Sequence, residues 1–93
     1  MIPVERLDYA EAQDDYVCFH VAGRELLKQQ TLADLEEGLD PARFVRVHRS
    51  YLINVERLAK IESEGRDSRS AVLKDGTRLP VSRAGYTRLK KLL

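Results

Sequence analysis

The chain has few of the residues that indicate a disulfide framework, a membrane span or a flexible linker. Its 93 residues include one cysteine, five glycines, three prolines and no tryptophan. A single cysteine, Cys18, excludes an intrachain disulfide. No apolar run approaches the ~20 residues that a membrane-spanning helix requires, and no signal peptide opens the chain. We therefore expect a cytoplasmic protein that does not insert into a membrane.

The chain also lacks motifs for catalysis and metal binding. It has no Gly-x-Ser-x-Gly sequence, no glycine-rich phosphate loop and no pair of carboxylates at a plausible cleft. Cys18, His20 and His48 are too few to hold a structural zinc ion without carboxylates. We expect no enzymatic activity, no cofactor and no metal, which leaves binding as the function to consider.

The charges that are present are divided unevenly along the chain. Residues 1–40 contain three Lys or Arg against ten Asp or Glu, whereas residues 41–93 contain 13 Lys or Arg against five Asp or Glu. Such asymmetry favours a polyanionic partner for the basic half. The alternative is that the two halves pair with each other within one folded domain, and the length predicts a single domain over residues 1–93.

Alternating apolar and polar residues predict a β-dominated domain. We expect strands over residues 4–10, 16–21, 24–28, 44–47, 51–53, 58–63, 70–73 and 77–81. Tight turns at Ala22-Gly23 and Asp75-Gly76 predict antiparallel pairing. Pro80 indicates an edge or a strand end, because it has no backbone N–H to donate. In the strand over residues 16–21, Val17, Phe19 and Val21 are predicted to face the core, and Tyr16, Cys18 and His20 to face the other side.

Two short helices complete the predicted fold. Thr31 begins the first helix as part of a capping box, and its acidic outer face is expected to point away from any nucleic acid. Ser82 is predicted to cap a terminal helix that covers residues 83–93. Gly85, in the first turn of that helix, lowers its stability by roughly 1 kcal/mol relative to alanine.

Two polar segments are candidates for binding. His48-Arg49-Ser50 breaks a run of apolar residues, and Ser82-Arg83 lies at the junction of a strand and a helix. The Ser82 hydroxyl and the first N–H groups of a helix form an anion site, and an arginine can pair with a guanine edge. The alternative is that these arginines only pair with acidic loops such as Asp14-Asp15, and the sequence pattern favours neither reading.

Residues 44–54, Phe-Val-Arg-Val-His-Arg-Ser-Tyr-Leu-Ile-Asn, resemble the signature of the LytTR family, the DNA-binding domain of LytR/AlgR/AgrA-type response regulators. Further stretches resemble the other landmarks of the family in the same order. They are residues 7–12, 15–17, 31–39, 73–76 and 79–83. The resemblance covers nearly the whole chain and implies an elongated, mainly antiparallel β fold with one internal helix and a short C-terminal helix.

The resemblance further implies that loops, and not a recognition helix, read the major grooves of duplex DNA. By position, the DNA-binding residues are Gln13, Asp14, Asp15, Tyr16, His48, Arg49, Ser50, Ser82 and Arg83. Arg83 and the first loop are expected at base edges, Arg49 at a middle contact, and His48 and Ser50 at phosphates. The sequence departs from the family at Ala84, where a basic residue is frequent, and the two aspartates of the first loop would repel phosphate.

The resulting hypothesis is sequence-specific binding of double-stranded DNA by the output domain of a bacterial transcription regulator. The resemblance implies binding to paired direct repeats, with two copies pairing on DNA. The family usually joins this domain to a phosphorylatable receiver, which the sequence does not contain, so we expect an excised domain or a stand-alone member. The alternative function is a protein–protein interaction module that uses exposed β edges.

Overall fold

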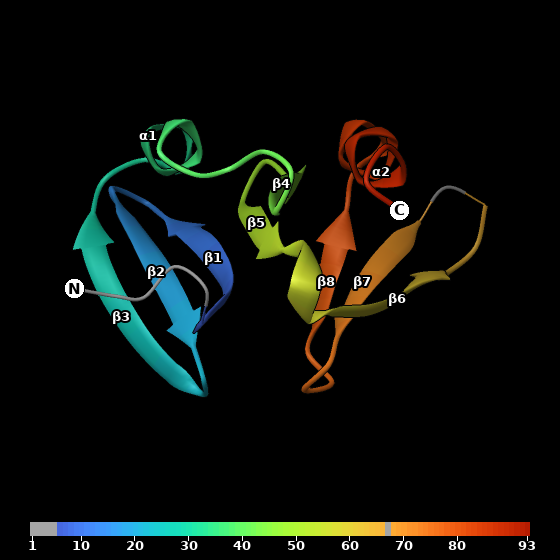
Figure 1. Cartoon of the computed structure of the whole chain (residues 1–93), viewed down its shortest axis with the longest axis horizontal. Coiled ribbons are helices and arrows are strands. Elements are labelled where there is room, and N and C mark those ends of the chain that lie inside the picture. The colour runs from blue at the N-terminus through green and yellow to red at the C-terminus, as the bar shows by residue number, and fades with distance from the viewer. Residues whose placement is uncertain (1–5, 67) are drawn as a thin grey trace.

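Two antiparallel sheets form most of the computed structural model, which describes residues 6–66 and 68–93 (Figure 1). The five-stranded sheet contains β1 (Leu7–Gln13), β2 (Tyr16–Val21), β3 (Arg24–Gln29), β4 (Phe44–His48) and β5 (Tyr51–Asn54). The three-stranded sheet contains β6 (Leu58–Ser63), β7 (Arg69–Leu73) and β8 (Arg78–Val81). The strand orders are β3-β2-β1-β5-β4 and β6-β7-β8. The remaining elements are α1 (Leu32–Glu37), the 3₁₀ helix η2 (Val55–Arg57) and α2 (Arg83–Lys90).

The predicted antiparallel β fold with two short helices is confirmed, with shifts at the ends of elements. β1 extends to Gln13, into the predicted loop, because its last residues pair with the start of β2. The first two residues of the predicted first strand, Val4 and Glu5, lie outside the described residues. Helix α2 ends at Lys90 and not at Leu93. Pro80 lies within β8, which is an edge strand as predicted.

Side-chain caps begin both helices, as the sequence predicts. The Asp34 backbone N–H donates to Thr31 Oγ1 over 3.0 Å. At the other helix, the Gly85 backbone N–H donates to Ser82 Oγ over 3.0 Å. Each bond satisfies one of the backbone donors that a helix leaves unpaired at its N-terminus. The caps therefore fix where each helix starts, and Ser82 also belongs to a candidate binding segment.

The core consists of two hydrophobic clusters on opposite sides of the five-stranded sheet. One cluster joins this sheet to α1, and its members are Leu7, Ala10, Val17, Phe19, Leu32, Phe44 and Leu52. The other joins it to the three-stranded sheet and to α2, and its members are Val45, Val47, Ile53, Ala71, Leu73, Leu79, Val81 and Leu89. This second cluster holds α2 next to β4.

The prediction for β2 is correct for Val17 and Phe19, which are buried, and wrong in part for Val21. Val21 is only partly buried. Cys18 is 2% exposed, although it faces away from the predicted core. Three consecutive buried residues mean that the sheet is covered on both faces around the middle of β2. Burial raises the pKa of the Cys18 thiol, so this residue behaves as a small apolar side chain.

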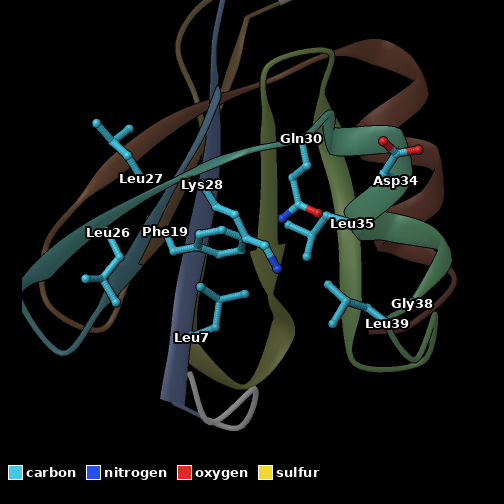
Figure 2. Close-up of a pocket in the computed structure, with 10 residues that line it drawn as sticks. All are labelled: Leu7, Phe19, Leu26, Leu27, Lys28, Gln30, Asp34, Leu35, Gly38 and Leu39. Atoms are coloured by element: carbon cyan, nitrogen blue, oxygen red, sulfur yellow. The ribbon is translucent and has the colours of Figure 1, made fainter. Parts of the chain in front are cut away.

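An apolar groove of about 600 Å³ separates β3 from α1, as Figure 2 shows. Phe19, Leu26, Leu35 and Leu39 are among the side chains that line it. Strand β3 is an edge of the sheet, and all six of its residues are exposed. Leu26 and Leu27 are 45% and 63% exposed. This end of the molecule thus has an exposed apolar surface.

Candidate nucleic-acid interface

The turn between β4 and β5 presents His48, Arg49 and Ser50 in a defined conformation. The Ser50 backbone N–H donates to His48 Nδ1 over 3.1 Å, so the imidazole is held against its own turn. The ring of Tyr51 lies 5.7 Å from the His48 ring and is tilted by 54°. Arg49 is exposed between two partly buried neighbours. The turn therefore presents its arginine at the tip while its flanking residues are fixed.

Tyr51 packs against this turn and helps to fix its position. Its hydroxyl donates to Glu11 Oε2 over 3.2 Å, which ties β5 to β1. Burial, the charge of Glu11 and this hydrogen bond all raise the pKa of Tyr51. The phenol therefore stays protonated at neutral pH and serves as a packing residue with one donated bond.

Arg46 holds the same turn in place. It was not among the predicted DNA-binding residues. Its Nη2 donates to the Arg49 backbone carbonyl over 2.7 Å. Its Nη1 lies 3.8 Å from Glu36 Oε1 on α1. A guanidinium group presents several donors in one plane, so a single side chain can link the turn to the helix. In the sequence, Arg46 is visible only as an arginine two residues before His48. Its partners are apparent only in the folded chain.

The first turn of α2 is attached directly to β4. The Ser82 backbone N–H donates to the Val47 carbonyl over 2.7 Å, and Ser82 Oγ donates to the same oxygen over 3.2 Å. Gly85 is buried, and a Cβ atom added there would lie 2.6 Å from Val47 Cα and closer still to the Val47 carbonyl. The absence of a side chain at Gly85 is therefore what allows the helix to approach the strand. This contact places Ser82-Arg83 beside the β4–β5 turn.

These two segments border one hollow of about 370 Å³. Its lining residues are Glu36, Arg46, His48, Arg49, Ser82, Ala84 and Arg88. Arg88 Nη1 donates to the Arg46 backbone carbonyl over 3.2 Å, so α2 also contacts the strand before the turn. Arg83 is exposed between two lining residues, and it forms an interaction within the molecule. The hollow, which we call the basic hollow, brings three arginines and one carboxylate together.

One acidic residue of α1 lies at the candidate binding segments. The sequence predicts that the acidic outer face of this helix points away from any nucleic acid. Asp34 and Glu37 do not line the basic hollow, whereas Glu36 does. Neither Arg88 nor Glu36 was predicted, because both reach the hollow through contacts between elements that are far apart in the sequence.

The first loop, residues 13–16, is linked to the same region but does not line the basic hollow. Gln13 pairs with Tyr16, and the turn between them has a positive φ of 53° at Asp14. All four residues of the loop are exposed. The Ala12 backbone N–H donates to the Ser50 carbonyl over 2.9 Å, which joins the end of β1 to the β4–β5 turn. In Figure 1 the β1–β2 turn, the β4–β5 turn and the start of α2 lie toward the same long side of the molecule.

The alternative reading of the basic residues was that they pair with the acidic first loop. Within the described residues, no ion pair joins Arg49 to Asp14 or Asp15, and the partners of Arg43, Arg46, Arg57 and Arg78 are other acids. Arg57 pairs with Asp8, and Arg46 pairs with Glu36. Pairing between the two halves of the chain therefore occurs, but it does not engage the tip of the β4–β5 turn.

The described part of the chain offers neither a membrane-spanning helix nor a cluster of metal ligands. No helix there is long and apolar enough to cross a membrane. Over residues 6–66 and 68–93, no three His, Cys, Asp or Glu side chains gather in a way that could hold a metal ion.

Comparison with known proteins identifies what this architecture is similar to. The family described as "LytTr DNA-binding domain" matches residues 1–93. The chain is 31% identical over 93 residues to the "Sensory transduction protein LytT" of Bacillus subtilis, and the match covers 100% of the chain and 39% of that protein. It is 36% identical over 88 residues to the "CO-responsive transcriptional regulator RcoM" of Rhodospirillum rubrum, which covers 91% of the chain and 36% of that protein.

A solved structure has the same fold as this chain. The "LytTr DNA-binding domain of putative methyl-accepting/DNA response regulator" from Bacillus cereus superposes with a TM-score of 0.88 at 25% identity, covering 98% of the chain and 84% of that structure. The chain spans less than two fifths of the length of the two curated relatives named above. The similarity to them is therefore that of one domain within longer proteins.

Proposed function

The chain belongs to the LytTR family of DNA-binding domains, and from this premise we propose that it binds double-stranded DNA sequence-specifically as the output domain of a bacterial transcription regulator. The observation that carries the proposal is the basic hollow, where Arg49 and Ser82 share one exposed surface. Neither residue is buried, and the tip of the turn is not engaged by an acidic loop. Arginine and hydroxyl groups on one rigid surface are the groups that contact phosphates and base edges.

Each segment has a proposed role. Arg83 pairs with a guanine edge in one major groove, and residues 13–16 reach base edges in the next groove. Arg49 makes the contact between the two grooves, while His48 and Ser50 contact phosphates. The first N–H groups of α2, next to Ser82, hold a further phosphate. The longest dimension of the molecule is 38 Å, which is similar to the ~35 Å of one turn of B-DNA.

The aspartates of the first loop fit base contacts better than backbone contacts. Asp14 and Asp15 are both exposed at the β1–β2 turn. A carboxylate repels phosphate, but it accepts a hydrogen bond from the amino group of cytosine in the major groove. We therefore assign this loop to base reading and expect its preferred base to differ from that of relatives without the two acids.

We also propose that two copies bind paired direct repeats and that the domain works within a longer regulator. The relatives are more than twice as long as this chain, so the signal that controls DNA binding would come from another segment. A phosphorylatable receiver is the segment that this family usually carries. Gel mobility of the chain on duplexes with one or two repeats tests the pairing, since two copies on the two-repeat duplex give a second, slower band.

The test of the site assignment begins with selection of a duplex from a random library. Fluorescence anisotropy on the selected duplex then compares Arg83→Ala, Arg49→Ala and a control, Arg24→Ala. Arg24 is an exposed arginine at the start of β3 and outside the proposed interface. Arg83→Ala should cost about 1–3 kcal/mol of binding free energy and relax one base position. Arg49→Ala should weaken binding and make the salt dependence shallower by about one unit of slope.

The outcome that contradicts the assignment is equal affinity for all three variants and the unaltered chain. If only the Arg24→Ala variant lost affinity, the DNA interface would lie instead at the β2–β3 turn, next to Arg24.

The second candidate function, a protein–protein interaction module, has one observation in its favour. Strand β3 is a fully exposed edge with two exposed leucines, and an edge strand can pair with an extended segment of another chain. A salt titration with random duplex DNA separates the two functions. Affinity that falls steeply with salt supports DNA binding, whereas no binding at low salt supports the protein–protein module.

A further inference from the structure

One carboxylate lies among the arginines of the proposed DNA surface. Glu36 lines the basic hollow with Arg46, Arg49 and Arg88, and its side chain is 44% exposed. A negative charge at a surface that contacts phosphates weakens binding to any duplex, whatever its sequence. The neighbouring acids of α1 do not line the hollow, so this cost to affinity is specific to Glu36.

Glu36 faces an arginine that is already attached to the β4–β5 turn. Arg46 Nη2 donates to the Arg49 carbonyl over 2.7 Å, and Arg46 Nη1 lies 3.8 Å from Glu36 Oε1. The Arg46 side chain is 26% exposed, so it is the less exposed partner of this ion pair. The carboxylate therefore supplies a partner for the outer part of the guanidinium group, at the place where a DNA phosphate would otherwise bind it.

We propose that Glu36 sets the sequence-independent part of DNA affinity, because it keeps Arg46 on the backbone of the turn and away from DNA phosphate. This inference rests on the proposed function. A phosphate contact adds affinity for every sequence and carries no sequence information. Suppressing one such contact lowers affinity for random DNA and leaves discrimination to the residues that reach base edges. Glu36 thus acts through Arg46 as a positioning residue.

The experiment compares Glu36→Gln with Glu37→Gln, two substitutions that remove the same charge from adjacent residues of α1. Both glutamates are exposed on the helix, and only the first lines the basic hollow. Affinity is measured by fluorescence anisotropy over a series of salt concentrations. The probes are a random-sequence duplex and the duplex selected from a library.

We expect Glu36→Gln to raise affinity for the random duplex and for the selected duplex by a similar factor, about three- to tenfold at low salt. The salt dependence should become steeper by up to about one unit, since Arg46 becomes available to a phosphate. Glu37→Gln should change either affinity by less than about twofold. The gain in affinity and the steeper salt dependence should therefore occur only in the Glu36 variant.

A third variant, Arg46→Met, tests whether Glu36 acts through Arg46. In this background Glu36→Gln should no longer steepen the salt dependence. If Arg46→Met does not fold, as judged by thermal unfolding, Arg46→Lys replaces it, and Glu36→Gln should then steepen the slope less than in the unaltered chain.

Equal effects of Glu36→Gln and Glu37→Gln overturn the inference. So does a steeper slope that persists without Arg46. A chain that binds no duplex at all overturns the proposed function instead, so the two failures are distinguishable.

Discussion

Substituting Gly85 by alanine tests how closely α2 packs on β4, because sequence and structure predict opposite signs. Helix propensity alone favours alanine at an interior position by about 1 kcal/mol. In the folded chain, however, the added Cβ would lie 2.6 Å from Val47 Cα and closer still to the Val47 carbonyl carbon and oxygen. Real Cβ atoms essentially never approach other atoms closer than 3.0 Å, and the atoms here belong to backbone, which cannot rotate away. The helix must move away from the strand.

The size of the effect follows from these two terms. Overpacking of a well-packed interior costs about 1–3 kcal/mol, and a backbone contact belongs at the upper end of that range. After the gain in helix propensity is subtracted, the net loss in the free energy of unfolding is about 2 kcal/mol. For a domain of this size that corresponds to a fall in Tm of about 8–16 °C. Moving α2 would also break the bonds from Ser82 to Val47, so affinity for the selected duplex should fall in the folded variant.

Differential scanning calorimetry of Gly85→Ala and Gly38→Ala provides the measurement and its control. A Cβ at Gly38 would meet only the Leu35 carbonyl oxygen, at an ordinary 3.7 Å, and the φ of Gly38 is −91°. Gly38→Ala should therefore leave the free energy of unfolding unchanged or raise it by up to about 1 kcal/mol. If Gly85→Ala were as stable as the unaltered chain, or more stable, the packing of α2 on β4 would be refuted.

Two further substitutions test the cap of α2 and the partly buried phenol of Tyr9. Ser82→Ala removes the acceptor for the Gly85 N–H and should lower the free energy of unfolding by about 1 kcal/mol in thermal melts. Ser82→Thr keeps a hydroxyl and should be about as stable as the unaltered chain. If Ser82→Ala were equally stable, the cap would be excluded. Burial, reinforced by Glu11, raises the pKa of Tyr9 to about 12, and an unfolded tyrosine titrates near 10. Because the unfolded state loses this proton first, urea unfolding should show stability falling as pH rises from about 10 to about 12. Tyr9→Phe should reduce that fall, and an identical pH profile for the variant would contradict the burial of the phenol.

The strands and caps were predictable because they depend on local patterns. Alternation placed β2 correctly, and the Thr31 and Ser82 caps follow from a few adjacent residues. Contacts between distant segments were not predictable in the same way. Nothing local shows that the Ala12 N–H donates to the Ser50 carbonyl or that Gly85 lies on Val47.

The basic hollow illustrates the same limit. His48, Arg49 and Ser82 were predicted from two separate segments, and the structure brings these segments together. Arg46, Arg88 and Glu36 were missed because each is an ordinary charged residue of a strand or helix until the fold brings them together. The first loop lies along the same side of the molecule but outside the hollow, and its role in binding stays a prediction.

The most direct test of the central claim is hydroxyl-radical footprinting of the chain on the selected duplex. The account predicts that residues 13–16, 48–50 and 82–83 contact one side of the double helix. Protection should then fall on a single face over about one helical turn, with the two major-groove contacts flanking a middle contact. Protection around the whole circumference, or a footprint unchanged when both Arg49 and Arg83 are replaced by alanine, would contradict it.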